Sequence, residues 1–342
     1  MALRWPQGAH GGVLGDDEGV DTMMGISGRM RRHPVAWFFA LALGFEVVVL
    51  AVFLFSGAAG KFDAARKAAG LEDRTDFVAA YRLAVEAPQA IPGVVLSILQ
   101  PFTPDVAAFA VAGLAFGMVG LVRLLHGFRF WSAEVGWRRG LRTWGLMLLA
   151  FFVFMPLATA GLDALFMPKG TWEWSGHPLS WSLLPALFIG LFLNVGAVSE
   201  ESGWRGFAQP ILQARRTPLA AALIVGVLWG VWHFPARPDI LMGAYGLSGG
   251  ALLLGILVVR FVFLSVVMAH FYNRAGGSTL IAIAMHGLHN DPVLFSGTIT
   301  ADTTVSYVIS ELALLGPIAL VSVAVLCVSG RKLGLDTPSA RW

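Results

Sequence analysis

Eight stretches of the chain are each long and apolar enough to cross a lipid bilayer, and this constrains the fold more than any other feature. A transmembrane α-helix needs about 20 consecutive, mostly apolar residues. Inside a bilayer every backbone polar group must bond internally, so only helices and closed barrels can span it. The sequence therefore predicts an all-α, polytopic bundle of about eight spans. The stretches are 34–56, 104–125, 143–166, 181–199, 217–235, 247–270, 278–297 and 306–328.

The composition also indicates an integral membrane protein. Of the 342 residues, 56% are hydrophobic and 13% are charged, whereas a typical soluble domain has about 45–50% and about 25%. The net charge of +3 does not suggest a basic face that binds nucleic acid. The single cysteine, Cys327, excludes an intramolecular disulfide and a cysteine-based zinc site. We therefore expect a protein surrounded by membrane lipid, without a nucleic-acid partner.

The chain divides into four predicted parts. Residues 1–33 are polar and glycine-rich, and we expect a disordered cytoplasmic tail. Residues 34–180 hold the N-terminal spans and, at 61–87, a mixed-charge amphipathic segment outside the bilayer. Residues 181–297 contain most of the ionisable groups that lie within apolar sequence. Residues 298–342 form the last span and a short basic tail.

Basic residues in the loops predict the orientation of the bundle. Cytoplasmic loops of membrane proteins carry an excess of Lys and Arg. With eight spans, the basic clusters of this chain all fall on one side, which places both termini in the cytoplasm. The clusters are Arg29, Arg31 and Arg32; Arg123, Arg129, Arg138, Arg139 and Arg142; Arg215 and Arg216; and Arg331 and Lys332.

Glu200, Glu201 and Arg205 form the first polar motif, at the end of the fourth stretch. Charged groups inside a bilayer cost at least about 2.5–3.5 kcal/mol each, so their presence needs a reason. Glu201 and Arg205 are four residues apart and can pair on one face of a helix. Glu200 is turned about 100° away from Glu201, so it can face a different partner.

Two further motifs deliver His233, His286 and Asn290. His286 and Asn290 are four residues apart, so they share one helical face. If the helices are continuous, a hairpin at Arg215 and Arg216 brings His233 to a depth similar to that of the two glutamates. The seventh stretch brings His286 and Asn290 to a comparable level. Three segments thus supply two carboxylates, two imidazoles and one amide to one region.

These side chains suit hydrolysis. A carboxylate and an imidazole can hold a water molecule and remove its proton. A second imidazole and an amide NH₂ can donate hydrogen bonds to a developing oxyanion. Glu200, His233 and His286 could instead hold zinc, which would activate water directly. The residues alone leave both alternatives open.

The three motifs together resemble those of the CPBP intramembrane proteases. This family includes the type II CAAX prenyl endopeptidases and the bacteriocin-immunity and lysostaphin-resistance-like proteins. Its pattern is Glu-Glu-x-x-x-Arg, then aromatic-x-x-x-His, then His-x-x-x-Asn. The chain matches it over about 181–295 and carries Trp229 where the family usually has Phe. The resemblance makes 181–297 the expected catalytic core.

The resemblance also implies a role for each motif residue. Glu200 and His233 would activate water, and His286 and Asn290 would stabilise the oxyanion. Glu201 and Arg205 would order the site. Members of the family have been described as metal-dependent and as glutamate proteases, so a divalent metal such as zinc and no metal are both expected possibilities.

The expected function is therefore that of an endopeptidase that cleaves membrane-associated proteins or peptides. A non-enzymatic membrane scaffold or a bacteriocin-immunity-type protein is the alternative, in which the buried polar groups only hold helices together. An ion-coupled transporter using Glu46, Glu200 and Arg260 is a third interpretation. For Glu46 and Arg260 themselves, the simplest expectation is a structural ion pair between spans 1 and 6.

Overall fold

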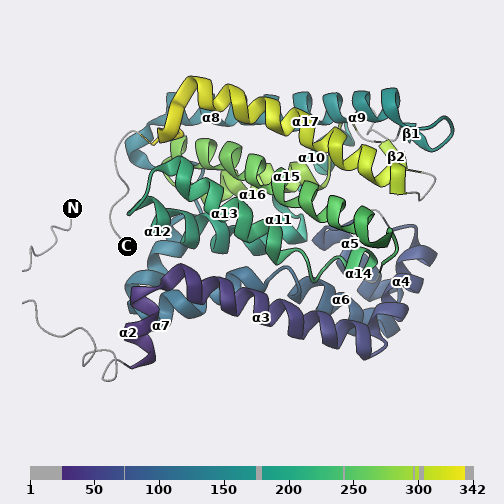
Figure 1. Ribbon diagram of the computed structural model, residues 1–342, viewed down its shortest axis with the longest axis horizontal. Coiled ribbons are helices and arrows are strands. Elements are labelled where there is room, and N and C mark those ends of the chain that lie inside the picture. Colours follow the sequence, from purple (N-terminus) through teal and green to yellow (C-terminus); the bar gives the residue numbers. More distant parts are fainter. Residues whose placement is uncertain are drawn as a thin grey trace, which may run out of the picture.

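The computed structural model describes residues 25–72, 74–174, 179–241, 243–295, 297–299 and 304–335. These residues are almost entirely helical (Figure 1). Two three-residue strands, β1 (Trp172–Trp174) and β2 (Gly297–Ile299), pair in antiparallel fashion. The predicted all-α fold is therefore confirmed.

Five long apolar segments form the frame of the bundle and are, by length and composition, able to cross a bilayer. They correspond to five of the eight predicted spans, because their apolar runs are uninterrupted. The protein is thus an integral membrane protein. The five are α3 (Pro34–Phe55), α7 (Thr103–His126), the continuous run of α8 (Trp137–Leu148), η3 (Leu149–Phe154) and α9 (Met155–Phe166), α15 (Gly246–Arg274), and α17 (Thr304–Ser329).

The other three predicted spans are shorter helices, so the count of eight full spans is not confirmed. The stretch 181–199 breaks at Asn194, whose backbone is extended and whose Oδ1 accepts a hydrogen bond from Ala197 N at 3.0 Å. The helix within 217–235 has 15 residues, or about 22 Å, against about 30 Å of hydrocarbon. Their bounds are α10 (Leu183–Phe192), α11 (Val195–Glu201), α13 (Pro218–Trp232) and α16 (Thr279–Asn290).

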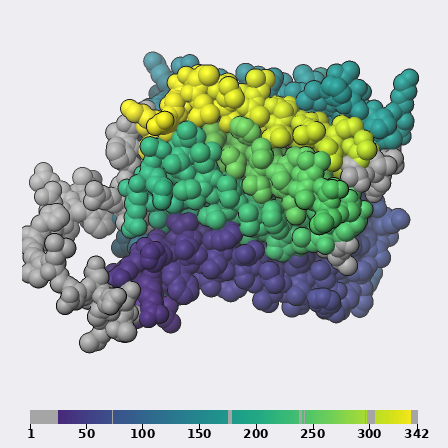
Figure 2. Space-filling model, in the orientation of Figure 1, coloured from purple at the N-terminus to yellow at the C-terminus, as the bar shows by residue number. Residues whose placement is uncertain are grey.

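The short helices lie inside the frame of long ones. α13 packs against α15, α15 against α17, and α3 against α7. Figure 1 shows α13, α15 and α16 between α17 above and α3 below. In Figure 2 the N-terminal and C-terminal helices, purple and yellow, form opposite flanks around the green middle segments. The remaining short turns are η2 (Ala133–Val135), α14 (Pro238–Leu241) and η5 (Gly330–Lys332).

Residues 58–101, here called the α4–α6 segment, contain the predicted amphipathic helix as two helices. Gly70, with φ +64°, ends the first helix, and Asp76 caps the second by accepting from Val78 N at 3.0 Å and Ala79 N at 2.9 Å. A small apolar cluster that includes Leu71 and Leu83 holds the segment together. Its elements are α4 (Ala58–Ala69), α5 (Phe77–Glu86), η1 (Pro88–Ala90) and α6 (Ile91–Leu99).

The predicted disordered tail needs a correction at its end. Residues Ile26–Arg32 form a helix, α2, rather than disordered chain. Met30 is buried against the core, and Ser27 Oγ donates to the carbonyl of Leu114 in α7 at 2.8 Å. These tertiary contacts stabilise a helix that a polar local sequence does not predict. The rest of the predicted tail lies outside the described residues.

The expected ion pair between Glu46 and Arg260 is wrong. Glu46 Oε1 accepts a hydrogen bond of 2.6 Å from Gln100 Nε2, so its partner belongs to the α4–α6 segment. Arg260 instead pairs with Glu311 of α17 at 3.1 Å. Glu46 and Arg260 therefore each have a polar partner on a segment that packs beside their own helix.

Candidate active site

The first motif lies on a helix that changes its winding. α11 ends at Glu201, and the π-helix η4 (Ser202–Ala208) and then α12 (Gln209–Gln213) follow. Single π-turns inside α-helices are frequent at functional sites. All of Ser202–Ala208 is buried, and Gly203 N donates to Asp105 Oδ1 of α7 at 2.7 Å. A Cβ at Gly203 would lie 2.8 Å from the carbonyl oxygen of Pro104, so this close packing requires glycine.

Glu201 is the centre of a fully buried ionic cluster. Its Oε1 accepts hydrogen bonds from Arg205 Nη1 at 3.1 Å and from His286 Nδ1 at 2.8 Å. Glu201 and Arg205 are both 0% exposed. The predicted pairing of these two residues is confirmed, although it forms across η4 rather than a regular α-turn. The Arg205 guanidinium also lies 4.0 Å from the ring centroid of Trp229.

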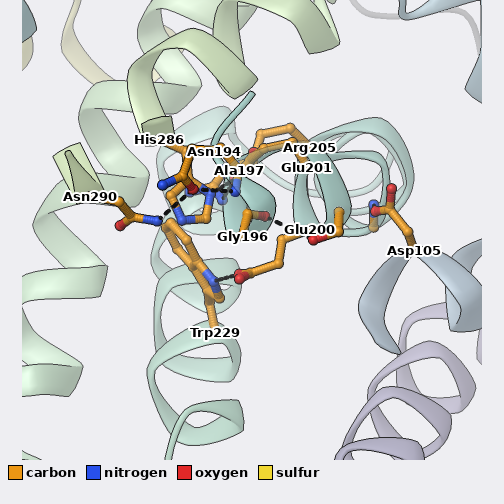
Figure 3. Close-up of polar contacts among 12 residues, drawn as sticks. Asp105, Asn194, Gly196, Ala197, Glu200, Glu201, Arg205, Trp229, His286 and Asn290 are labelled. Carbon is orange, nitrogen blue, oxygen red and sulfur yellow. Dashed lines mark hydrogen bonds and ion pairs between the residues drawn. The ribbon is translucent and has the colours of Figure 1, made fainter. Parts of the chain in front are cut away.

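Glu200 points away from that cluster, as its position on the helix predicts. Its Oε2 accepts a 2.7 Å hydrogen bond from Trp229 Nε1 (Figure 3). The backbone oxygen of Trp229 lies 2.8 Å from His233 Nδ1, and the Trp229 ring meets His286 edge to face at 5.0 Å. Trp229, where the resembled family usually has Phe, therefore contacts residues of all three motifs.

Asn290 is held by a residue that the motif search missed. Its Nδ2 donates to Asn194 Oδ1 at 3.2 Å. Asn194 Nδ2 in turn donates to Asp291 Oδ2 at 2.6 Å and to Thr75 Oγ1 at 3.0 Å. Asn194 thus connects α11 and α16 with the loop before α5. The sequence offered only a weak signal for it, an Asn in a position that can cap a helix.

One cavity of about 440 Å³ brings the motifs together. Glu200, His233 and Asn290, one residue from each motif, lie in its wall beside Gly196. A Cβ at Gly196 would lie 3.3 Å from Glu200 Oε1 and 3.4 Å from Asn290 Nδ2. The bare backbone of this glycine therefore leaves room between the carboxylate and the amide. Among the described residues, the lining set does not include Glu201, Arg205 or His286.

The opposite wall of the cavity comes from the α4–α6 segment. Apolar side chains of Leu71, Leu83 and Ile98 line it, and Arg66 and Arg74 lie among them. The sequence analysis assigned this segment no part in the site, because no local pattern connects a polar amphipathic helix with motifs about a hundred residues away or more.

The predicted metal ligands do not form a three-ligand set. Glu200, His233 and His286 each use one polar atom for a protein contact: Glu200 Oε2 with Trp229, His233 Nδ1 with a backbone oxygen, and His286 Nδ1 with Glu201. Within the described part of the chain, no group of three His, Cys, Asp or Glu residues is arranged to hold a metal ion. We therefore derive no chemical step through a metal.

Comparison with known proteins gives matches in this same region. Residues 180–290 match the family model described as "Rce1-like: Type II CAAX prenyl endopeptidase Rce1-like". A 60-residue part of the chain, 18% of its length, is 40% identical to CAAX prenyl protease 2 of Methanococcus maripaludis and covers 21% of that protein. A longer part, 162 residues or 46% of the chain, is 28% identical to the uncharacterized protein YyaK of Bacillus subtilis and covers 48% of it.

The matched region contains all six motif residues. The chain spans less than half the length of either relative, so these proteins are compared with it only over the site region. Residues 180–290 are thus Rce1-like, and the resemblance of the three motifs to the CPBP family of intramembrane proteases is confirmed.

Proposed function

We propose that the protein is an intramembrane endopeptidase with the chemistry of the type II CAAX proteases, acting on membrane-associated peptides. The observation that carries this proposal is the common cavity. Glu200, His233 and Asn290 come from three separate segments and line the same space of about 440 Å³. A scaffold would need such groups only to bond helices together, whereas these three face a space that a peptide can enter.

In the proposed reaction Glu200 acts as the general base. A water molecule held by Glu200 and His233 loses a proton to the carboxylate as its oxygen attacks the peptide carbonyl carbon. The new C–O bond pushes the carbonyl electron pair onto oxygen, and Asn290 Nδ2 donates a hydrogen bond to this oxyanion. Collapse of the intermediate breaks the C–N bond, and the proton on Glu200 passes to the leaving amine.

We assign Glu201, Arg205 and His286 to positioning. The shared bonds of Glu201 Oε1 with Arg205 and His286 fix both partners, and the Arg205 guanidinium supports the face of Trp229. Trp229 in turn holds the Glu200 carboxylate. This division departs from the family roles for His286, which the resemblance makes an oxyanion donor, because His286 is bonded to Glu201 rather than placed in the cavity wall.

We propose a glutamate-type rather than a metal-dependent reaction. The arrangement of the three residues supports it, because His286 is not in the cavity wall with Glu200 and His233, and the described residues contain no group of three His, Cys, Asp or Glu placed to hold a metal ion. Metal removal tests this point: treatment of the purified protein with 1,10-phenanthroline leaves cleavage unchanged. Loss of cleavage that added zinc restores would contradict the glutamate-type reaction.

The test of the activity is a comparison of protein termini in membranes that contain the wild type or the Glu200→Gln variant at matched levels. We expect new termini only with the wild type, because loss of a general base lowers the rate by about 10²–10⁴-fold. Glu86→Gln is the matched control, since Glu86 is exposed on α5 and, among the described residues, forms its ion pair with Arg82. If Glu200→Gln gives the wild-type termini while a deletion strain does not, the scaffold alternative replaces this proposal.

A further inference from the structure

The two ends of the molecule differ in charge. α2, α12 and the C-terminal end of α17 lie at one end, on the left of Figure 1. The loop before α8 joins the same end, because Arg129 Nη2 donates to Gly276 O at 3.0 Å and Ser132 N to Ala275 O at 3.0 Å. We call this the basic end. It carries Arg29, Arg31, Arg32, Arg129, Arg138, Arg139, Arg215, Arg216, Arg274, Arg331 and Lys332.

The opposite end mixes both signs of charge. It contains the α4–α6 segment, α14 and the β1–β2 pair, on the right of Figure 1. Arg82 pairs with Glu86 at 2.7 Å and Arg74 with Asp76 at 2.5 Å. Lys and Arg residues here alternate with Asp and Glu along the chain. This end therefore lacks the excess of basic residues that marks cytoplasmic loops.

The catalytic cavity lies towards the mixed-charge end. α13 begins just after Arg216 at the basic end, and His233 directly follows its last residue. α16 begins just after Arg274 and Gly277, and Asn290 is its last residue. Both helices thus carry their catalytic side chains at the end that points away from the basic loops. The α4–α6 segment then closes the cavity from the same side.

The rim of the cavity is suited to water rather than to lipid. The Arg74 side chain is 45% exposed, and the hydrogen bond to Asp76 raises the pKa of its guanidinium above the usual value, so it stays charged. Thr75 beside it is also exposed. Charged side chains are expensive in a hydrocarbon environment. The mouth at Arg74 and Thr75 therefore opens to the aqueous side of this end.

The positive-inside rule assigns the basic end to the cytoplasm. We infer that the catalytic cavity opens on the non-cytoplasmic face of the membrane. Its substrate class is then a membrane-anchored peptide segment exposed on that face, rather than a C-terminus that lies in the cytoplasm. This inference rests on the proposed endopeptidase function for the substrate, but the side on which the cavity opens does not depend on activity.

Cysteine labelling in intact cells tests the sidedness directly. In a Cys327→Ser chain, Ala68→Cys places a thiol on exposed α4, and Ala214→Cys places one on the exposed turn after α12. A membrane-impermeant maleimide labels Ala68→Cys in intact cells and Ala214→Cys only after the membrane is permeabilised. The reverse pattern overturns the inference. Both substitutions replace an exposed alanine and leave the loop charges unchanged, so neither alters the orienting signal.

The termini found with wild type but not with Glu200→Gln test the substrate class. We expect the cleaved bonds to map to non-cytoplasmic segments of membrane-anchored proteins, close to the bilayer. Cleaved bonds that map to cytoplasmic segments overturn the inference even if proteolysis itself is established. If no termini differ, the proposed function fails, and the labelling pattern still decides on which face the cavity opens.

Discussion

The indole N–H of Trp229 gives the proposed general base a partner that phenylalanine would not provide. The bond to Glu200 Oε2 is 2.7 Å long, and the indole is fully buried. A donor of this kind stabilises the ionised form of a carboxylate. The residue at this position therefore sets how easily Glu200 takes up a proton, in addition to forming an aromatic wall.

Replacing Trp229 by Phe tests this role. We expect the acidic limb of the pH profile of kcat/KM to move to higher pH by about one to two units. Hydrogen bonds to charged groups contribute about 1.5–3 kcal/mol, and about 1.4 kcal/mol corresponds to one unit. Trp232→Phe is the matched control, because Trp232 also lines the cavity but its Nε1 has no hydrogen-bond partner among the described residues. Equal profiles for the two variants would contradict the assignment.

At the residue scale, the sequence predicts the motif residues but not their supports. Spacing alone gives the pairing of Glu201 with Arg205 and the different direction of Glu200, because both follow from helix geometry. Asn194, Thr75 and Asp105 have no such local signature. Their roles depend on contacts between segments about a hundred residues apart or more, which a single sequence does not encode visibly.

At the scale of elements, the break before α11 determines the position of Asn290, the proposed oxyanion donor. Asn194 ends the apolar stretch as a helix cap and, with the same side chain, orients Asn290. One residue thus determines where α11 starts and where the amide of α16 points. A continuous span through 181–199 would remove both effects.

Asn194→Ala should therefore reduce both stability and kcat. Loss of the cap costs about 1 kcal/mol of unfolding free energy, and misplacement of Asn290 lowers kcat by up to about 100-fold with little change in KM. Thr217→Ala is the control, because Thr217 caps α13 by accepting from Ala220 N at 3.2 Å away from the cavity. Thermal unfolding and cleavage kinetics are measured on both. A kcat loss of equal size in Thr217→Ala would show that only stability is involved.

The same break explains why the prediction of spans was better for some elements than for others. Long apolar runs such as Pro34–Phe55 become helices of nearly the predicted length. In the sequence, the three stretches that carry the site look as long as full membrane spans, because apolar residues continue past Asn194 and past Asn290. Their helices end instead at Leu193, His233 and Asp291, and Asn194 begins the next helix as its N-cap. Hydropathy therefore detects the length of an apolar stretch but not the position at which a helix ends within it.

At the scale of the whole molecule, two separate parts line the cavity that holds the proposed active site. The bundle supplies the proposed catalytic residues, and the α4–α6 segment supplies apolar residues that line the same cavity. Glu46 in α3 bonds with Gln100 at the end of that segment, and Val195 N donates to Thr75 O at 2.9 Å. These contacts hold the segment against the bundle, so the proposed substrate-binding wall and the proposed catalytic residues are located on different elements.

α5 lines the cavity but carries none of the proposed catalytic residues. A substitution in α5 should therefore change substrate binding without changing the rate of the chemical step. Ala80 lines the cavity, and Ala80→Phe would occupy part of the space that a substrate side chain fills. We expect KM to rise about 5–10-fold, which corresponds to about 1 kcal/mol of lost binding, while kcat stays within about twofold of the wild type. Val85→Phe is the control, because Val85 is exposed on α5 and does not line the cavity. A fall in kcat with unchanged KM would instead place this wall in the catalytic step.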